Sequence, residues 1–420
     1  MKVLLVGHAC CPGRGSEPGV TWNPAWHLSE RHQVWVLTHP QSADETNAYL
    51  AANPRPNLRM VYVNLPSKID PWKVNRGERG VKLHYLMWQH LVLRRARELV
   101  AAEQIDVAHH ISFGTVNAAP LLYKLPIPVV WGPIGGGEVM PWKFRRYFRG
   151  TLAGETFRLI KSKFLPWVPS LRRMSQRAAA TLVANLETAR IVEQAGGKNT
   201  QLAIDFGLPE GYASDVSPDR EESDTLKLLW AGRLESRKAL PLALEAVAQT
   251  RARVHLTVAG DGPLRREWEQ LARDLRVDDR TTFLGSVPWA TMSKLFRESD
   301  VFVFTSLRDK LGTVLLEAMG HGLPILTLNH NGARCFVPDG AGVKVSVNVP
   351  EQTVAELAAG IEELAASYPR RRAMGEIAIR FARANTSGAR VRELVRTYEQ
   401  VISTRPAAFT PAGLTESGSS

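Results

Sequence analysis

The segment LKLLWAGRLESRK, residues 226–238, decides the fold class. Its apolar run Leu226–Ala231 predicts a buried strand, because the run is short, nearly continuous and followed by a glycine. Arg233 and Lys238 come next, at the carboxyl end of that strand and just before a helical pattern that starts at Leu240. A strand of this kind is typical of a parallel sheet that helices cover on both faces.

Short apolar runs of the same type recur on both sides of this segment and alternate with helical patterns, most clearly at Val81–Ala102. They predict an α/β protein with two doubly wound domains in tandem. The predicted strands are Lys2–Gly7, Gln33–Thr38, Arg59–Val63, Asp106–His110, Ile127–Trp131, Ala180–Asn185 and Gln201–Ile204 in the first series, and Leu226–Ala231, Val254–Ala259, Thr281–Leu284, Val301–Phe304, Pro324–Leu328 and Val343–Val347 in the second.

Composition shifts suggest the domain boundaries. We assign residues 1–206 to an N-terminal domain, 207–225 to a linker without apolar periodicity, and 226–384 to a C-terminal domain. Residues 385–405 are expected to form a helix that packs back on the N-terminal domain. The tail 406–420 is rich in Pro, Gly, Ser and Thr, which predicts disorder.

The overall charge points to an anionic partner. The 420 residues carry a formal net charge of +12, which suits a nucleotide, a nucleic acid or an acidic membrane surface. The three cysteines predict neither a disulfide framework nor a zinc site. No signal peptide or spanning segment is expected, so we predict a cytoplasmic protein that can be peripheral on the inner face of the cytoplasmic membrane.

One segment concentrates this charge. Lys143–Arg177 holds ten basic residues and a single acid, Glu155, and aromatic residues are interleaved from Trp142 onward. The mixture predicts contact with an anionic membrane rather than with nucleic acid, which is not an expected partner. The alternative is a solvated basic face whose aromatic side chains belong to the core.

Several common signatures are missing. The glycines of Gly13–Gly19 lack the spacing of the dinucleotide fingerprint, and the phosphate loop of ATPases is absent. No Asp-x-Asp pair with apolar flanks offers a clamp for a metal-bound diphosphate. We therefore expect no cofactor and no metal, and we do not expect hydride transfer.

Two places in the second domain favour an anion. Arg233 and Lys238 stand at the edge where open parallel sheets bind ligands, and Arg233 suits a bidentate contact to a diphosphate. Near Gly312 a second helix begins, and its first free N–H groups, at Gly312, Thr313 and Val314, would face another anion. Glu317 lies on the first turns of that helix and can accept hydrogen bonds from two sugar hydroxyls.

With these residues in view, the sequence resembles the family 4 glycosyltransferases, which are retaining, nucleotide-sugar-dependent enzymes of the GT-B fold with two Rossmann-like domains facing a cleft. The resemblance extends from about Met1 to Thr404 and is strongest from Leu228 to Val347. Five motifs stand in the family's order: GRL at 232–234 with Lys238, VAGDGP at 258–263, LGSV at 284–287, DVFV at 300–303, and GTVLLEAM at 312–319 with Gly322 and Pro324.

The resemblance implies roles for these residues. Arg233 and Lys238 would hold the donor diphosphate, together with the N–H groups of Thr313 and Val314. Glu317 would bind the ribose, and Ser286 and Val287 would line the base pocket. The family has two glutamates separated by seven residues. Here Glu317 is the second, and Asp309, which is shorter by one methylene, takes the place of the first. Asp309 is assigned to the catalytic set with Arg233 and Lys238.

In the first domain the resemblance implies that Gly15 opens the first helix and belongs to the donor-binding residues, and Pro24 is expected to start that helix anew. His110, favoured over His109 because it is nearer the carboxyl edge of its strand, is the predicted histidine of the reacting centre; a satisfied core histidine is the alternative. The glycine-rich loop Gly132–Glu138 resembles that of a subgroup acting on bacterial surface glycans and glycolipids, so Gly136 and Glu138 are placed on the acceptor side.

The predicted function is transfer of a sugar, with retention, from a nucleotide-sugar to a glycan, glycolipid or lipid-linked acceptor, as in the synthesis of bacterial surface polysaccharides. Two alternatives stay open. One is a nucleotide-sugar epimerase of the same fold, and the other is an inactive, membrane-docked carbohydrate-binding scaffold, to which Asp309 in place of glutamate would point.

Overall fold

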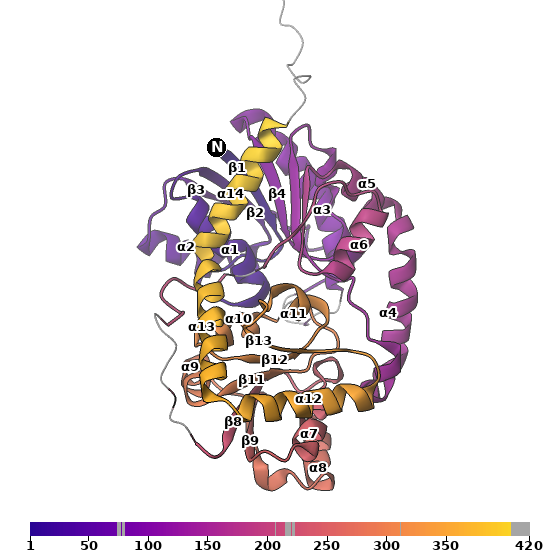
Figure 1. Cartoon of the computed structure of the whole chain (residues 1–420). Coiled ribbons are helices and arrows are strands. Elements are labelled where there is room, and N and C mark those ends of the chain that lie inside the picture. Colours follow the sequence, from indigo (N-terminus) through magenta and orange to yellow (C-terminus); the bar gives the residue numbers. More distant parts are fainter. Residues whose placement is uncertain are drawn as a thin grey trace, which may run out of the picture.

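The structure is a computed structural model that describes residues 1–73, 77, 80–205, 207–214, 220, 223–310 and 312–404. Part of the predicted linker 207–225 and the whole predicted tail 406–420 lie outside these residues. The chain forms two domains, which lie one above the other in Figure 1. Each domain has one parallel sheet with helices on both faces. The predicted α/β class with two Rossmann-like domains is therefore confirmed.

The first sheet has seven strands in the order β3-β2-β1-β4-β5-β6-β7, and all its strand pairs are parallel. The order reverses between β1 and β4, which is where open sheets of this kind form a ligand-binding crevice. The strands are β1 (Lys2–Gly7), β2 (Gln33–Thr38), β3 (Leu58–Tyr62), β4 (Val107–Ser112), β5 (Val129–Ile134), β6 (Ala180–Val183) and β7 (Thr200–Leu202). The helices are α1 (Ser16–Leu28), α2 (Ala43–Ala52), α3 (Val81–Glu103), α4 (Leu152–Phe164), α5 (Pro169–Arg177) and α6 (Leu186–Gln194).

The second sheet repeats the design with six parallel strands in the order β10-β9-β8-β11-β12-β13, and its reversal lies between β8 and β11. The strands are β8 (Leu226–Ala231), β9 (Val254–Ala259), β10 (Thr281–Gly285), β11 (Val301–Phe304), β12 (Ile325–Leu328) and β13 (Gly342–Val345). The helices are α7 (Leu240–Gln249), α8 (Arg265–Asp274), α9 (Trp289–Glu298), α10 (Thr313–Gly320), α11 (Asn331–Phe336), α12 (Pro350–Ala365) and α13 (Tyr368–Ala384).

The last helix, α14 (Ser387–Ser403), leaves the second domain and runs along the first (Figure 1). Its Tyr398 is fully buried in the core of the first domain, and the Tyr398 hydroxyl lies 2.7 Å from Nδ1 of His109 on β4. No helix among the described residues has both the length and the apolar character that a membrane span requires.

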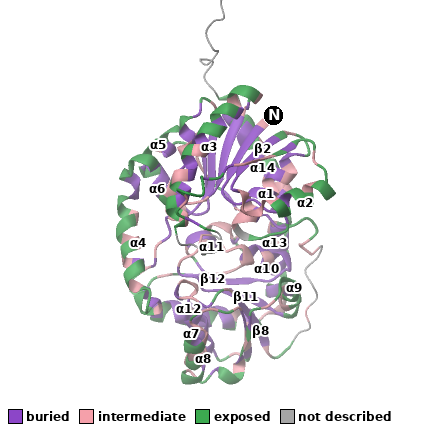
Figure 2. Ribbon diagram, turned by 180° about the vertical axis from the view of Figure 1, so that it is seen from behind, coloured by how far each residue is buried: buried purple, intermediate pink, exposed green. Residues whose placement is uncertain are grey.

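The basic segment Lys143–Arg177 bridges the two domains, and its aromatic residues have two different fates. Phe144 and Phe148, in the short helix Trp142–Phe148, are fully buried in the main core of the second domain. Phe157 and Phe164 on α4 are 68% and 63% exposed, and Trp167 is 65% exposed. Figure 2 shows the outer side of α4 as largely exposed. The aromatic residues of the segment are thus divided between the core and the surface, and its contact with a membrane stays a prediction.

Two local predictions for the first domain are wrong. The helix α1 runs from Ser16 to Leu28 without a new start at Pro24, which lies inside it. The strand expected to end at His110 continues to Ser112, so His110 lies inside the sheet and not at its carboxyl edge. The apolar pattern missed this extension because polar Ser112 is itself buried. Ser112 pairs with Gly7 of β1 after a shift in register between Val6 and Gly7.

Candidate functional site

Two cavities lie at the carboxyl ends of the strands. The smaller, of about 320 Å³, joins the two domains: Ser112 and Gly114 line it from the first domain and Lys310 and Thr313 from the second. The larger, of about 650 Å³, belongs to the first domain, and Thr115 lines both. We call them the cleft cavity and the acceptor-side cavity. Further side chains of the acceptor-side cavity include His8, Trp72, Tyr85, Phe113, Phe157 and Lys161.

Lys238 is held at the edge of the second sheet by a carboxylate. Its ammonium group pairs with Asp309, whose other oxygen lies 3.3 Å from the Arg237 guanidinium. The Ser306 hydroxyl and the Lys310 N–H also donate to Asp309, at 3.2 and 3.1 Å. The sequence placed Lys238 and Asp309 in one catalytic set, and the structure brings them into direct contact.

The two loops that carry this pair are joined because they follow neighbouring strands, β8 and β11. The backbone N–H of Leu307 donates to the carbonyl of Arg237 at 2.9 Å, and the Trp230 indole donates to the Thr305 hydroxyl at 3.1 Å. Arg233, in the same loop as Lys238, is exposed. The basic pair therefore consists of one fixed and one exposed side chain.

Asp309 is ionised at neutral pH. Burial by itself would raise the pKa of this carboxyl group, but the charges of Lys238 and Arg237 outweigh burial and hold the pKa below its ordinary value. A carboxylate with this many donors is poorly suited to bind sugar hydroxyls as well. Its geometry suits the positioning of Lys238.

Helix α10 begins next to the cleft cavity. Its N-cap, Gly312, has a φ of +85°, and a Cβ there would lie 2.7 Å from the Phe304 ring, so the position favours glycine. Thr313 at the first helical position lines the cleft cavity, and Val314 is partly buried against the core. The N–H groups of a first helical turn have no acceptor inside their own helix, so this helix start suits an anion.

Glu317, further along α10, lies near an aromatic pair. Burial raises the pKa of Glu317 above its ordinary value, and a hydrogen bond from Trp289 acts in the opposite direction. The rings of Trp289 and Tyr212 have centroids 5.4 Å apart. Of the predicted base-pocket residues that precede Trp289, Ser286 is exposed and Val287 packs against the core. Sequence reasoning missed Trp289 because it reads as the first residue of an ordinary helix.

The glycine-rich loop of the first domain is closely packed. Gly136 has a φ of +97° and lines the acceptor-side cavity. Glu138, predicted on the acceptor side, is buried: it accepts from the N–H of Gly136 at 2.8 Å and from the Asn185 amide at 2.5 Å. Glu138 thus holds the loop in shape, and its contact with an acceptor stays a prediction.

Lys310 connects the two domains at this loop and was missed by the sequence analysis. Its ammonium group lies 2.9 Å from Asp205 and donates to the carbonyl of Pro133 at 3.0 Å, while its own carbonyl accepts from Asn185 at 3.1 Å. The side chain lines the cleft cavity. A basic residue next to Asp309 was the available signal, but its partners lie more than a hundred residues away.

The two histidines of β4 are both buried. His109 is fully satisfied by Tyr398 and by the Gly132 carbonyl, each at 2.7 Å. Nε2 of His110 lies 2.8 Å from the Tyr85 hydroxyl, and Tyr85 in turn lines the acceptor-side cavity. In the described part of the chain, His110 is not among the residues that line either cavity. Gly15 is the N-cap of α1 and is exposed.

Comparison with known protein families gives a match for the second domain, which provides Lys238, Asp309 and Glu317 to the site. Residues 215–381 match the family model of the glycosyl transferases group 1. This group 1 region contains the Lys238–Asp309 pair, α10 and Glu317. Over 172 residues the chain is 32% identical to the lipopolysaccharide core biosynthesis glycosyltransferase LpsE of Rhizobium meliloti (strain 1021), covering 40% of this chain and 48% of LpsE.

A D-inositol 3-phosphate glycosyltransferase of Geodermatophilus obscurus is 33% identical over 165 residues, which cover 36% of this chain and 37% of that enzyme. The chain thus spans about half or less of the length of these curated relatives. The similarity to them is consistent with the group 1 assignment of residues 215–381.

Solved structures resemble the whole chain. The lipopolysaccharide outer core galactosyltransferase WaaB in its apo form has a TM-score of 0.65 at 13% identity, covering 95% of this chain and 99% of WaaB. Anabaena Alr3699/HepE in complex with UDP has a TM-score of 0.61 at 17% identity, covering 95% of this chain and all of that chain. These likenesses show the fold, and the two-domain arrangement of the chain is GT-B.

Proposed function

We propose that the chain is a retaining glycosyltransferase that moves a sugar from a nucleotide-sugar to a glycan, glycolipid or lipid-linked acceptor. The observation that carries this proposal is the cleft cavity, which has Thr313 at the start of α10 on one wall and Ser112 and Gly114 on the other. A donor bound at the second sheet would present its sugar to the first domain at this point.

The donor diphosphate would bind between Lys238, Arg233 and the first turn of α10. Lys238 is pre-oriented by Asp309, and Arg233 is free to move onto the ligand. A positive group that is already in place where negative charge develops stabilises a transition state without further reorganisation. Since these groups supply the positive charge, we propose that the donor site needs no metal ion.

The proposed chemistry uses the leaving group as the base. The acceptor oxygen attacks the anomeric carbon on the face that the diphosphate leaves, and the departing diphosphate oxygen takes the acceptor proton. Two buried carboxylates near the cleft are occupied, Asp309 by Lys238 and Glu138 by the loop of Gly136. Their engagement supports a mechanism in which the protein orients the reactants and stabilises charge.

The nucleoside would lie beside Glu317. The Glu317 carboxyl group would accept from the two ribose hydroxyls in place of its bond from Trp289, and the exposed Ser286 would border the base. The bound UDP of the HepE structure supports a uridine nucleotide as the first ligand to test.

The acceptor-side cavity suggests a lipid-linked substrate. Its rim includes Leu86 of α3 and Phe157 of α4, both more than half exposed, together with Lys82 and Lys161. Apolar and basic side chains at the mouth of a cavity suit a lipid chain and an anionic headgroup region. The similarity to the lipopolysaccharide core enzyme LpsE supports a bacterial surface glycolipid as acceptor.

A transfer assay tests the function. The chain should bind UDP or another nucleoside diphosphate, hydrolyse its matching nucleotide-sugar slowly without acceptor, and form a glycoside with the donor's anomeric configuration, as shown by NMR. An epimerised sugar nucleotide would indicate an epimerase, and binding without hydrolysis or transfer would indicate a scaffold. Either result would refute the proposal.

Liposome co-sedimentation tests the membrane contact. Binding should increase with anionic lipid, decrease with salt, and weaken when Phe157, Phe164, Lys161 and Lys163 are replaced by Ser. The control is the double variant Arg94→Ser and Arg97→Ser. It also removes two positive charges, but from the second half of α3, away from the mouth of the acceptor-side cavity. Equal binding to neutral and anionic vesicles at low salt, or equal losses in both sets of variants, would remove the membrane role.

A further inference from the structure

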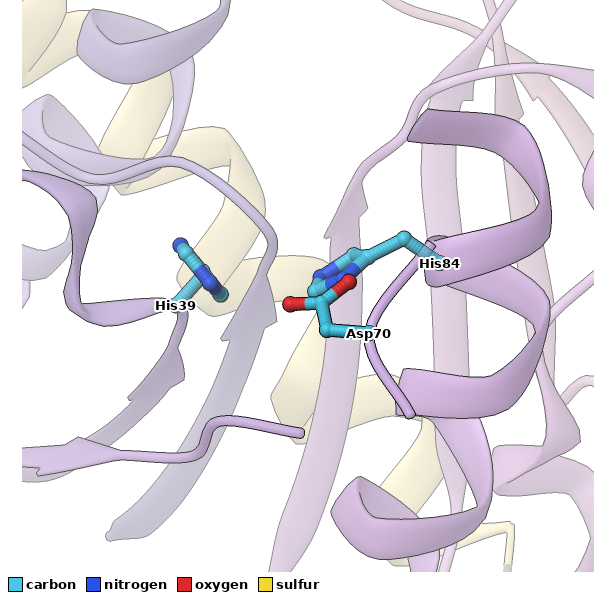
Figure 3. Close-up of side chains that lie close together, drawn as sticks. All are labelled: His39, Asp70 and His84. Atoms are coloured by element: carbon cyan, nitrogen blue, oxygen red, sulfur yellow. The ribbon is translucent and has the colours of Figure 1, made fainter. Parts of the chain in front are cut away.

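A cluster of imidazole rings lies at the carboxyl edge of the first sheet, apart from the donor site. His8 follows β1, His39 follows β2 and His84 lies in the first turn of α3. Asp70, from the segment between β3 and α3, is the carboxylate beside them. In Figure 3 the Asp70 carboxylate and the His84 ring lie together, and His39 approaches them from the opposite side.

The contacts resemble those of a metal site and its supporting groups. Oδ1 of Asp70 lies 2.7 Å from Nδ1 of His84, and Nε2 of His39 lies 3.0 Å from the Asn64 side-chain oxygen. A ligand atom from each of His39, Asp70 and His84 lies within 4.8 Å of the other two. Histidines that bind metals commonly hold their second nitrogen with an oxygen acceptor, as Asn64 does for His39. Nδ1 of His39 accepts from the N–H of Gln41 at 3.2 Å, and a metal ion would take the place of that hydrogen bond.

The cluster is buried and leaves nitrogen lone pairs unused. His84, His8 and His39 are 0%, 3% and 6% exposed. Among the described residues, Nε2 of His84 and Nε2 of His8 are buried without a hydrogen-bond partner.

We infer that His39, Asp70 and His84 form a divalent transition-metal site of the zinc class, with a fourth position open to water or another ligand. Two imidazoles and one carboxylate are a donor set that suits Zn²⁺. Zinc–ligand bonds of about 2.0–2.2 Å require ligand atoms roughly 3.4 Å apart, so the spread of 4.8 Å closes with side-chain movements of about 1.5 Å or less. His8 lines the acceptor-side cavity, which provides an entry path.

The metal would fix one wall of that cavity. Asp70 accepts from the N–H of Trp72 at 2.9 Å, and the Trp72 ring packs 5.0 Å from His84 and 5.3 Å from His39. Trp72 itself lines the cavity. A metal bound to Asp70 would thus tie the β3–α3 segment to the edge of the sheet. The sequence predicted no metal, and the inference departs from that prediction for the first domain only.

Metal binding is measured directly, without the transfer reaction, so its result is separate from the proposed function. The untagged full chain is dialysed against a chelator and titrated with Zn²⁺ in competition with a chromophoric indicator. We expect one Zn²⁺ per chain and a higher melting temperature on binding. A Co²⁺-loaded sample should show visible d–d bands without the near-ultraviolet thiolate band that Cys10 or Cys11 would produce.

Variants identify the ligands. Asp70→Asn and His84→Gln should abolish stoichiometric binding, and Asn64→Ala, at an exposed position, should weaken Zn²⁺ binding about 10- to 100-fold. His255→Gln replaces a partly buried histidine of β9 in the second domain and should leave binding unchanged. If the wild-type chain binds no Zn²⁺ and its melting temperature does not move, or if Asp70→Asn and His84→Gln bind like the wild type, the cluster is a packed set of neutral rings and the inference is wrong.

Discussion

Replacing Asp309 by Asn tests whether this carboxylate is the ionised partner of Lys238. The substitution keeps the size and shape of the side chain and removes its charge. Lys238 and Arg237 would then be left without their shared counter-charge, at side-chain exposures of only 12% and 29%. Removal of one member of a buried ion pair is costly because the remaining charge stays desolvated.

The magnitude follows from the geometry. At an effective dielectric constant of about 20, a unit charge about 4 Å away contributes roughly 4 kcal/mol, and Asp309 has two such cations. Desolvation of the three groups offsets several kcal/mol of that attraction. A net loss of about 3–5 kcal/mol in the free energy of unfolding remains, which corresponds to roughly 6–20 °C in the melting temperature of a domain of this size.

The pH dependence provides an internal check. Because the folded-state pKa of Asp309 lies below its ordinary value, its stabilising contribution is complete above that ordinary value, near pH 4, and is lost as the pH falls through the folded-state pKa. Wild type and Asp309→Asn should therefore differ at pH 7 and converge in strong acid. Differential scanning calorimetry from pH 7 into strong acid, below pH 3, follows both.

Asp339→Asn is the matched control. Asp339 pairs with Lys344 in the same domain, but its side chain is 96% exposed, and an exposed pair of this kind contributes little. We expect no measurable change in its melting temperature. If Asp309→Asn melts within 1 °C of the wild type at pH 7, the carboxylate does not serve as the counter-charge, and a direct role at the sugar becomes the better explanation.

Three further predictions concern activity. Arg233→Ala and Lys238→Ala should each lower kcat by about 10²-fold or more, because each removes one donor that stabilises the transition state. Arg273→Ala, on the exposed face of α8, should leave kcat unchanged. Near-wild-type turnover in the first two variants would refute the proposed binding of the donor diphosphate by Arg233 and Lys238. Hydrolysis of the donor without acceptor should persist in EDTA, and loss restored by Mg²⁺ or Mn²⁺ would contradict a metal-free donor site. Gly136→Ala places a Cβ 2.5 Å from a threonine hydroxyl and should reduce transfer but not donor hydrolysis, whereas Gly154→Ala, with open space around it in the same cavity, should leave both unchanged.

Local sequence patterns were sufficient for the architecture. Five predicted strands, at Lys2–Gly7, Gln33–Thr38, Leu226–Ala231, Val254–Ala259 and Val301–Phe304, match the structure at both ends. Strands buried on both faces are continuous apolar runs, so composition alone marks them. The pattern failed where buried residues are polar, as at Ser112, and where proline is accommodated inside a helix, as at Pro24.

Sequence spacing also indicated which residues stand at the carboxyl edges of the sheets, including Lys238, Asp309, Gly312 and Gly136. A residue's position along its own strand or helix follows from short-range periodicity. The identity of the residue that it contacts does not follow from periodicity, because side chains that meet across a cleft are brought together by packing and not by their distance in the sequence.

Tertiary structure alone therefore decided how these residues are used. Asp309 is 71 residues from Lys238, and their contact forms because β8 and β11 are neighbours at the reversal of strand order. Lys310 meets Pro133 across the two domains, and His39 meets Asp70 and His84 because β2 ends and α3 begins at the same edge of the first sheet. Burial then sets the charge of each group, since the cost of removing a charge from water depends on the complete surroundings of the side chain.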